Sequence, residues 1–172
     1  MIDTLLFDLD NTLLDFDKAE ANAITRALGD VGISATNEMR DCYHKINLAQ
    51  WKLLEQGKMT REEVKMRRFK LLFQEFDIKV SPQEVAKHYQ DYLGQGHYFI
   101  EGAEEVLQEL SKRFRIYLVT NGTLSVQRGR LKSSGIEKYL QGVFISEEIG
   151  YNKPSIESVS YTHLTLPTIL RV

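Results

Sequence analysis

Cysteine, excess basic charge and long apolar runs are all scarce in this sequence, and each shortage excludes a class of protein. Cys42 is the only cysteine among 172 residues, so neither an intrachain disulfide nor a cysteine metal cluster can form. The net charge of -2 supplies no basic surface for a nucleic-acid polymer or an anionic membrane. Asp3 and Asp8 interrupt the N-terminal apolar residues, so we expect neither a signal peptide nor a membrane span there. These absences favour a cytoplasmic protein that acts on a small molecule.

What the sequence does contain indicates an α/β fold. Three short apolar runs, residues 4–8, 115–120 and 142–146, predict buried strands. Helical patterns at about residues 103–112 and 125–135 lie before the second run and before the third. Because parallel strands need a crossover connection, this alternation predicts a parallel sheet with helices between its strands.

Between the first and second strands, residues from about 18 to 94 predict an all-helical insert of about four helices. The start signals are capping boxes, in which a hydroxyl and a carboxylate satisfy free N–H groups of the first helical turn. These boxes pair Thr60 with Glu63 and Ser81 with Glu84. The expected end signals are Gly29, Gly57 and Gly94.

Polar residues follow each predicted strand at its carboxyl end. Asp8 and Asp10 come after the first strand, Thr120 and Asn121 end the second, and Lys153 lies just beyond the third. Because open parallel sheets bind ligands at the carboxyl edge, we expect these side chains to form one site. Each feature alone is also typical of an ordinary turn or of a solvated lysine. Their occurrence together, in order, at successive strand ends favours the site.

The residue types in this set are suited to phosphate chemistry. Asp8 and Asp10 lie two apart on an extended segment, so both carboxylates point to the same side. Two close carboxylates repel, and Mg²⁺ is commonly held by one or two carboxylates together with phosphate oxygens. The pair therefore predicts a Mg²⁺ site. Thr120 and Asn121 offer a hydroxyl and a backbone N–H to a phosphoryl oxygen, and Lys153 offers a compact positive charge.

The segments FDLDNT, VTNG and GYNKP resemble the first three motifs of the haloacid dehalogenase-like hydrolase superfamily, over about residues 1–157. The resemblance implies a Rossmann-like parallel-sheet core and Mg²⁺-dependent hydrolysis of a phosphomonoester. It implies that Asp8 is the nucleophile that forms an aspartyl-phosphate, and that Asp10 protonates the leaving group and then activates water. It further implies that Thr120 holds the phosphoryl group and that Lys153 orients and screens the nucleophile.

Finer features favour one branch of the superfamily. True haloacid dehalogenases usually lack the second acid, because halide departure needs no proton donor, so Asp10 favours a phosphatase. The segments DFD, NGTLSVQRGRL and FISEEIG, and Asn47 with Trp51, resemble the bacterial pyrimidine 5'-nucleotidase branch. The resemblance implies a nucleoside 5'-monophosphate as substrate. The alternatives are a phosphoglycolate or sugar-phosphate phosphatase, and a non-catalytic phosphate-binding fragment.

Asn47 and Trp51 are the candidate substrate-binding residues of the helical insert. They lie four residues apart, so they share one helix face and are able to meet a nucleobase by hydrogen bonding and stacking. The alternative is that Trp51 simply packs in the interior of the insert.

We expect a core formed by residues 1–14 and 96–157, a helical cap at residues 15–95, and a non-native tail at residues 158–172.

No acidic residue follows Glu157, and residues 159–168 resemble the translation of an adapter used to build sequencing libraries. The superfamily's fourth motif, an acidic pair that completes the Mg²⁺ shell, is expected downstream. We therefore expect a core truncated at its C-terminus and a weakly active or inactive fragment. The alternative is a divergent native C-terminus. Resequencing the gene from genomic DNA distinguishes the two, and the protein encoded by that sequence is the resequenced gene product.

Overall fold

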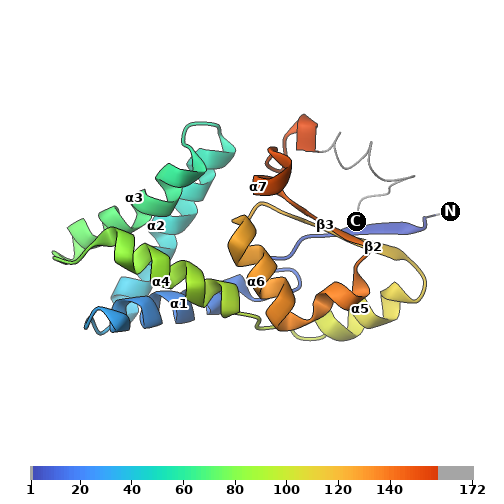
Figure 1. Ribbon diagram of the computed structural model, residues 1–172, viewed down its shortest axis with the longest axis horizontal. Coiled ribbons are helices and arrows are strands. Elements are labelled where there is room, and N and C mark those ends of the chain that lie inside the picture. The colour runs from blue at the N-terminus through green and yellow to red at the C-terminus, as the bar shows by residue number, and fades with distance from the viewer. Residues whose placement is uncertain (1, 159–172) are drawn as a thin grey trace. The chain divides into compact units, whose positions relative to one another are not determined.

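The computed structural model describes residues 2–158 and divides the chain into two compact units (Figure 1). The sheet unit contains the residues up to Phe16 and the described residues from His97 onward. The helical unit contains Asp17–Gly96. The predicted non-native tail lies outside the described residues, except for Ser158.

A parallel sheet forms the centre of the sheet unit. Its described strands are β1 (Thr4–Phe7), β2 (Arg115–Thr120) and β3 (Gly142–Ile145), in the order β1-β2-β3. All pairings are parallel, with Leu5 opposite Ile116 in the first pair. The predicted α/β class and the predicted parallel pairing are confirmed.

Helices connect these strands and bury their apolar residues. Helix α5 (Ala103–Ser111) precedes β2, helix α6 (Leu124–Ser134) and the 3₁₀ turn η1 (Ile136–Tyr139) lead from β2 to β3, and α7 (Ser146–Ile149) follows β3. The interior of the unit is formed by buried aliphatic side chains from the strands, helices and β1 loop. They include Leu9, Leu13, Leu14, Leu107, Ile116, Leu118, Leu131 and Ile136.

The loop after β1 alternates buried and polar residues. Leu9 and Leu13 are 0% and 2% exposed, so they anchor the loop in the apolar interior. Asn11 has a positive φ of 54°, which asparagine tolerates, and its Oδ1 accepts a hydrogen bond from the Phe16 N–H at 2.8 Å. The buried leucines and this turn together hold Asp8 and the residues after it at the carboxyl end of β1.

The helical unit contains α1 (Phe16–Asp30, whose first residue belongs to the sheet unit), α2 (Asn37–Glu55), α3 (Arg61–Glu75) and α4 (Pro82–Gln95). It matches the predicted all-helical insert. Its interior holds an aromatic cluster, in which the ring centroids of Tyr43, Phe69 and Tyr89 lie 5.3–5.4 Å apart. Such tilted and edge-on pairs add to the free energy gained from burial alone.

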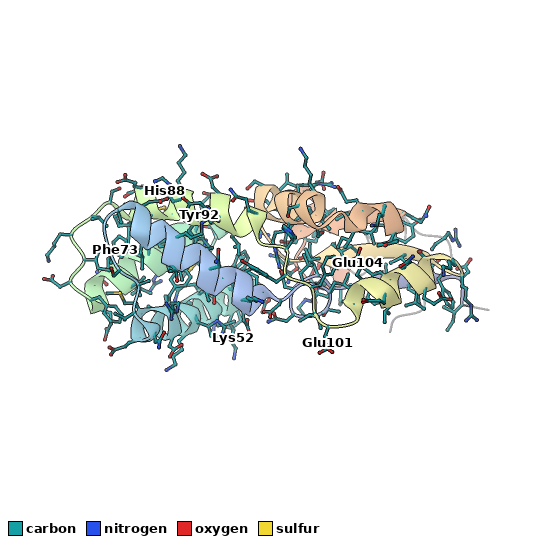
Figure 2. The ribbon with its side chains drawn as sticks, turned by 90° about the horizontal axis from the view of Figure 1, so that it is seen from below. Lys52, Phe73, His88, Tyr92, Glu101 and Glu104 are labelled. Carbon is teal, nitrogen blue, oxygen red and sulfur yellow. The ribbon has the colours of Figure 1, made fainter. Side chains whose placement is uncertain are left out.

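A polar cluster on the surface of this unit joins α1 to α4. The Tyr92 hydroxyl donates a hydrogen bond to Asp30 at 2.6 Å, and the Arg26 guanidinium lies 3.8 Å from the Tyr92 ring centroid. His88 lies one turn before Tyr92 on α4 and stacks on its ring (Figure 2).

Among the described helices, none is both long and apolar enough to cross a membrane.

The predicted helix boundaries are partly confirmed and partly corrected. The Thr60 capping box has both of its hydrogen bonds: the Thr60 side chain accepts from the Glu63 N–H, and the Glu63 side chain accepts from the Thr60 N–H. At the second predicted box, the Ser81 side chain accepts a hydrogen bond from the Glu84 N–H at 3.4 Å. Of the glycines expected to end helices, Gly57 follows α2 with a φ of 68°, but the other two lie inside their helices. Those two are Gly29 in α1 and Gly94 in α4.

Different glycines end these two helices. Gly32 adopts a φ of 78° after α1, and the Ile33 N–H beyond it bonds to the Leu28 carbonyl at 2.9 Å. Gly96 caps α4 through an N–H bond to the Leu93 carbonyl at 3.0 Å. The left-handed turn and the cap, rather than the first glycine along the sequence, therefore set where each helix stops.

Candidate active site

The two acids after β1 have different surroundings, and Asp8 is the more accessible. Its Oδ1 lies 2.8 Å from the Lys153 Nζ and accepts a hydrogen bond from the Leu9 N–H at 2.8 Å. The side chains of Asp8 and Lys153 are 44% and 31% exposed. Asp8 is therefore oriented by a cation and a main-chain donor while its carboxylate stays open to a ligand.

Lys153 is itself held in place by the end of β2. Its Nζ donates to the Val119 carbonyl at 2.9 Å. The Asn121 side chain spans the Lys153 main chain, with its Oδ1 accepting from the lysine N–H at 2.7 Å and its Nδ2 donating to the lysine carbonyl at 2.9 Å. The Asn121 amide therefore positions the lysine loop. Phosphate binding by its backbone N–H stays a prediction.

Thr120 lies at the carboxyl end of β2 and is 1% exposed. Its Oγ1 accepts a hydrogen bond from the Gln127 Nε2 at 2.7 Å. A hydroxyl has one proton to donate in addition to the lone pairs that accept, so this contact still allows Thr120 to donate to a phosphoryl oxygen.

Asp10 is bound through both of its carboxylate oxygens to residues of α6. The Gln127 Nε2 donates to Oδ2 at 2.8 Å, and the Arg130 Nη1 donates to Oδ1. The Arg130 Nη1 also donates to the Gln127 Oε1 at 3.2 Å. Gln127 and Arg130 are 1% and 0% exposed, whereas the Asp10 side chain is 30% exposed. Asp10 therefore sits at the boundary between a buried polar network and solvent.

Gln127 and Arg130 are the site residues that the sequence analysis missed. They lie within the NGTLSVQRGRL segment that resembles the nucleotidase branch, but that resemblance implies no role for either residue. The sequence feature that indicates them is their spacing, since residues three apart on a helix lie on the same face. In the structure that face adjoins the acid loop, since both residues donate hydrogen bonds to Asp10.

Contacts with α7 hold the first turns of α6. The Glu147 carboxylate accepts a hydrogen bond from the Leu124 N–H, and the Glu148 carboxylate pairs with Arg128 at 2.9 Å. Thr123, the residue before α6, makes no side-chain capping bond. Glu147 therefore supplies the acceptor that the first turn of a helix requires.

The fit of the site to Mg²⁺ depends on Asp8 and Asp10. Within residues 2–158 no group of three or more His, Cys, Asp or Glu side chains is placed to hold a metal ion. Asp8 offers an exposed carboxylate, which is a hard oxygen ligand of the kind Mg²⁺ prefers. Asp10 would contribute either a carboxylate oxygen shared with its α6 donors or its main-chain carbonyl oxygen. These two acids therefore fit part of a Mg²⁺ shell, in which water, substrate phosphate and the predicted downstream acids would supply the other oxygens.

Asn47 and Trp51, the candidate substrate-binding pair, belong to the helical unit. Asn47 is 1% exposed, its Nδ2 donates to Glu20 at 2.6 Å and its Oδ1 accepts from the Arg68 Nη1 at 2.9 Å. Trp51 is half-buried, and the Arg61 guanidinium lies 5.6 Å from its ring centroid. Asn47 thus joins two buried charged side chains, and contact with a nucleobase stays a prediction for both residues.

These observations define an α/β protein with acidic, hydroxyl, amide and lysine groups gathered at the carboxyl edge of a parallel sheet. A model of the haloacid dehalogenase-like hydrolase family matches residues 5–166, and the chain belongs to this family.

Individual relatives are similar to this chain over most of its length. HAD-hydrolase YfnB of Bacillus subtilis (strain 168) is 38% identical over 164 residues, which cover 95% of this chain and 70% of YfnB. Pyrimidine 5'-nucleotidase PynA of Streptococcus pneumoniae (strain ATCC BAA-255 / R6) is 41% identical over 151 residues, which cover 87% of this chain and 64% of PynA. The crystal structure of YfnB bound to magnesium aligns with a TM-score of 0.90 at 37% identity, covering 98% of this chain and 74% of that one. The chain thus spans roughly two thirds of the length of these two curated relatives.

Proposed function

We propose that this hydrolase cleaves phosphomonoesters with Mg²⁺ through an aspartyl-phosphate on Asp8, and that its substrate is a nucleoside 5'-monophosphate. The observation that carries the proposal is the accessible Asp8 carboxylate, fixed by Lys153 at the edge where Asp10 and Thr120 also lie. A nucleophile, a proton carrier, a hydroxyl donor and a cation are the groups that a two-step phosphoryl transfer requires.

In the first step an Asp8 carboxylate oxygen attacks phosphorus, and the ester P–O bond breaks on the opposite side. Asp10, in its protonated form, gives its proton to the departing alcohol oxygen. In the second step Asp10 takes a proton from water, whose oxygen attacks phosphorus and breaks the bond to Asp8. Inorganic phosphate leaves and Asp8 is regenerated.

The remaining residues bind and orient the phosphoryl group. Thr120 donates its hydroxyl proton to one phosphoryl oxygen, and the Asn121 backbone N–H donates to another. The Lys153 ammonium lies against Asp8, where it reduces repulsion between the carboxylate and the incoming phosphate. Asp8 and Asp10 would hold the Mg²⁺, which when bound neutralises charge on the transferring group.

The proposed nucleotide substrate is supported by the PynA relative, which is named a pyrimidine 5'-nucleotidase. The test is a panel of nucleoside 5'-monophosphates, phosphoglycolate and sugar phosphates, assayed on the resequenced gene product with Mg²⁺ and with EDTA. We expect the highest kcat/KM with pyrimidine nucleoside 5'-monophosphates and loss of activity in EDTA. Hydrolysis of only phosphoglycolate or sugar phosphates would overturn the substrate assignment. Phosphate binding without turnover would support the non-catalytic alternative.

A further inference from the structure

We propose that Gln127 and Arg130 are positioning residues that hold the Asp10 carboxylate for proton transfer to the leaving group. This inference rests on the proposed function, because the orientation of the Asp10 carboxylate matters for the reaction only if Asp10 is the proton carrier. It concerns how one side chain of the site is oriented by residues that do not themselves touch substrate.

Arg130 is a buried cation. Its side chain is 0% exposed, and removing a guanidinium from water is unfavourable unless hydrogen bonds and an opposite charge compensate. The described contacts of its Nη1 go to the Asp10 carboxylate and to the Gln127 amide oxygen. A buried cation is thus directed at one acid of the proposed catalytic pair.

The Gln127 amide is fixed by contacts through both its nitrogen and its oxygen. Its Nε2 donates to both Asp10 and Thr120, at 2.8 and 2.7 Å, and its Oε1 accepts from Arg130. Gly122 permits this position, since a Cβ there would lie 2.3 Å from the Gln127 Nε2. The amide therefore has one orientation, and it joins the proton carrier to the phosphate-binding hydroxyl.

Together these contacts give the two acids separate partners. Asp8 is paired with Lys153 and is open, whereas both oxygens of Asp10 are tied to a buried network on α6. Rotation of the Asp10 carboxylate breaks at least one of these hydrogen bonds. The network thus favours one orientation of Asp10 over the others, which is what a positioned acid–base group requires.

A purely structural role for the network is the competing explanation. Helix α6 is already anchored by buried Val126 and Leu131, so its packing does not depend on the polar pair alone. A structural role predicts equal losses with every substrate. A positioning role predicts losses that depend on how much the leaving group needs a proton.

The test compares a nucleoside 5'-monophosphate, whose alkoxide leaving group needs protonation, with p-nitrophenyl phosphate, whose phenolate leaves without it. In the resequenced gene product, we expect Gln127→Met and Arg130→Met each to lower kcat/KM for the nucleotide by about 10- to 100-fold, a share of the roughly 10²–10⁴-fold of general acid catalysis. The loss with p-nitrophenyl phosphate should be a few-fold at most. Arg130→Lys should recover part of the nucleotide activity.

Both substrates are assayed on the same preparation, so any unfolded fraction cancels in the ratio of the two kcat/KM values. Lys132→Met is the matched control, since it removes an exposed cation from the same helix, and it should leave the ratio unchanged. Asp10→Asn is the reference variant. If Asp10→Asn itself does not change the ratio, the proposed function is wrong. If Asp10→Asn changes it but Gln127→Met and Arg130→Met do not, this inference is wrong.

Discussion

At the residue scale, the two acids of the proposed site have different partners: Asp8 pairs with Lys153, and Asp10 accepts hydrogen bonds from Gln127 and Arg130. The contact between Asp8 and Lys153 joins residues far apart in the chain, and it was predictable because parallel strands present their carboxyl ends at one edge. Gln127 and Arg130 were not predictable in the same way. Which face of α6 turns toward Asp10 depends on the packing of that helix, and sequence spacing alone does not fix it.

Substitution of Lys153 tests whether its contact with Asp8 matters for chemistry. Lys153→Met leaves Asp8 without its cation, and we expect kcat/KM for the nucleotide to fall by about 10²- to 10³-fold. Lys153→Arg should recover only part, because a planar guanidinium does not reproduce the compact ammonium that reaches both Asp8 and Val119. Steady-state kinetics on the resequenced gene product measure this. Full activity in Lys153→Met would remove the lysine from the proposed mechanism.

The pair formed by His44 and Glu20 predicts a pH dependence of stability. His44 Nδ1 lies 2.6 Å from the Glu20 carboxylate, and this hydrogen bond raises the pKa of His44 above its ordinary value of 6.5. Burial raises the pKa of Glu20, although hydrogen bonds from His44 and Asn47 oppose the rise. For both groups the folded pKa exceeds the unfolded one, so their stabilising contribution is complete at low pH and is lost as the pH rises through the folded pKa.

We therefore expect His44→Ala to lower the free energy of unfolding more at about pH 6 than at about pH 8, two values on either side of the ordinary histidine pKa of 6.5. Denaturant unfolding at the two pH values measures the difference. In a Glu20→Gln background the pH dependence of the His44→Ala effect should shrink, because the carboxylate that raises the histidine pKa is gone. An effect of His44→Ala that is equal at both pH values would contradict this account.

At the scale of elements, the helices and strands were largely predictable and their ends less so. The second strand, residues 115–120, was predicted with the bounds it has, because a run of β-branched and aromatic residues separates two helical patterns. The glycines were harder to interpret. Gly29 and Gly94 look like helix ends in the sequence, but the chain continues as helix until a left-handed turn at Gly32 and a cap at Gly96.

Gly96 and Gly29 make a matched pair for testing this point. A Cβ on Gly96 would lie 2.8 Å from the Ala19 Cβ, so Gly96→Ala forces α1 and α4 apart, and we expect a loss of about 1–3 kcal/mol in the free energy of unfolding. At Gly29 a Cβ meets nothing within 4 Å, and we expect Gly29→Ala to raise that free energy by about 0.5–1 kcal/mol. Thermal or urea unfolding compares the two. Equal effects of the same sign would show that the close approach at Gly96 is not a constraint.

At the scale of the whole molecule, the fold class followed from the sequence because strand and helix patterns alternate around one helical insert. The buried charges of that insert were not predictable from the sequence. Glu20 and Arg68 are each 3% exposed and are linked through Asn47, whereas charged helical residues are ordinarily expected on a solvated face. The predicted non-native tail lies outside the described residues, except for Ser158, and both the tail and the truncated core stay predictions that resequencing tests.

The proposed mechanism requires a covalent bond between Asp8 and the phosphoryl group. The most direct measurement is mass spectrometry of the Asp10→Asn variant of the resequenced gene product, acid-quenched during turnover of p-nitrophenyl phosphate. With a leaving group that needs no proton, Asp8 should still be phosphorylated, while loss of the Asp10 base slows hydrolysis of the intermediate. We predict one phosphoryl group on Asp8, and none in the Asp8→Asn variant. Continued turnover with no phosphorylated peptide, or with the phosphoryl group on another residue, would contradict the account.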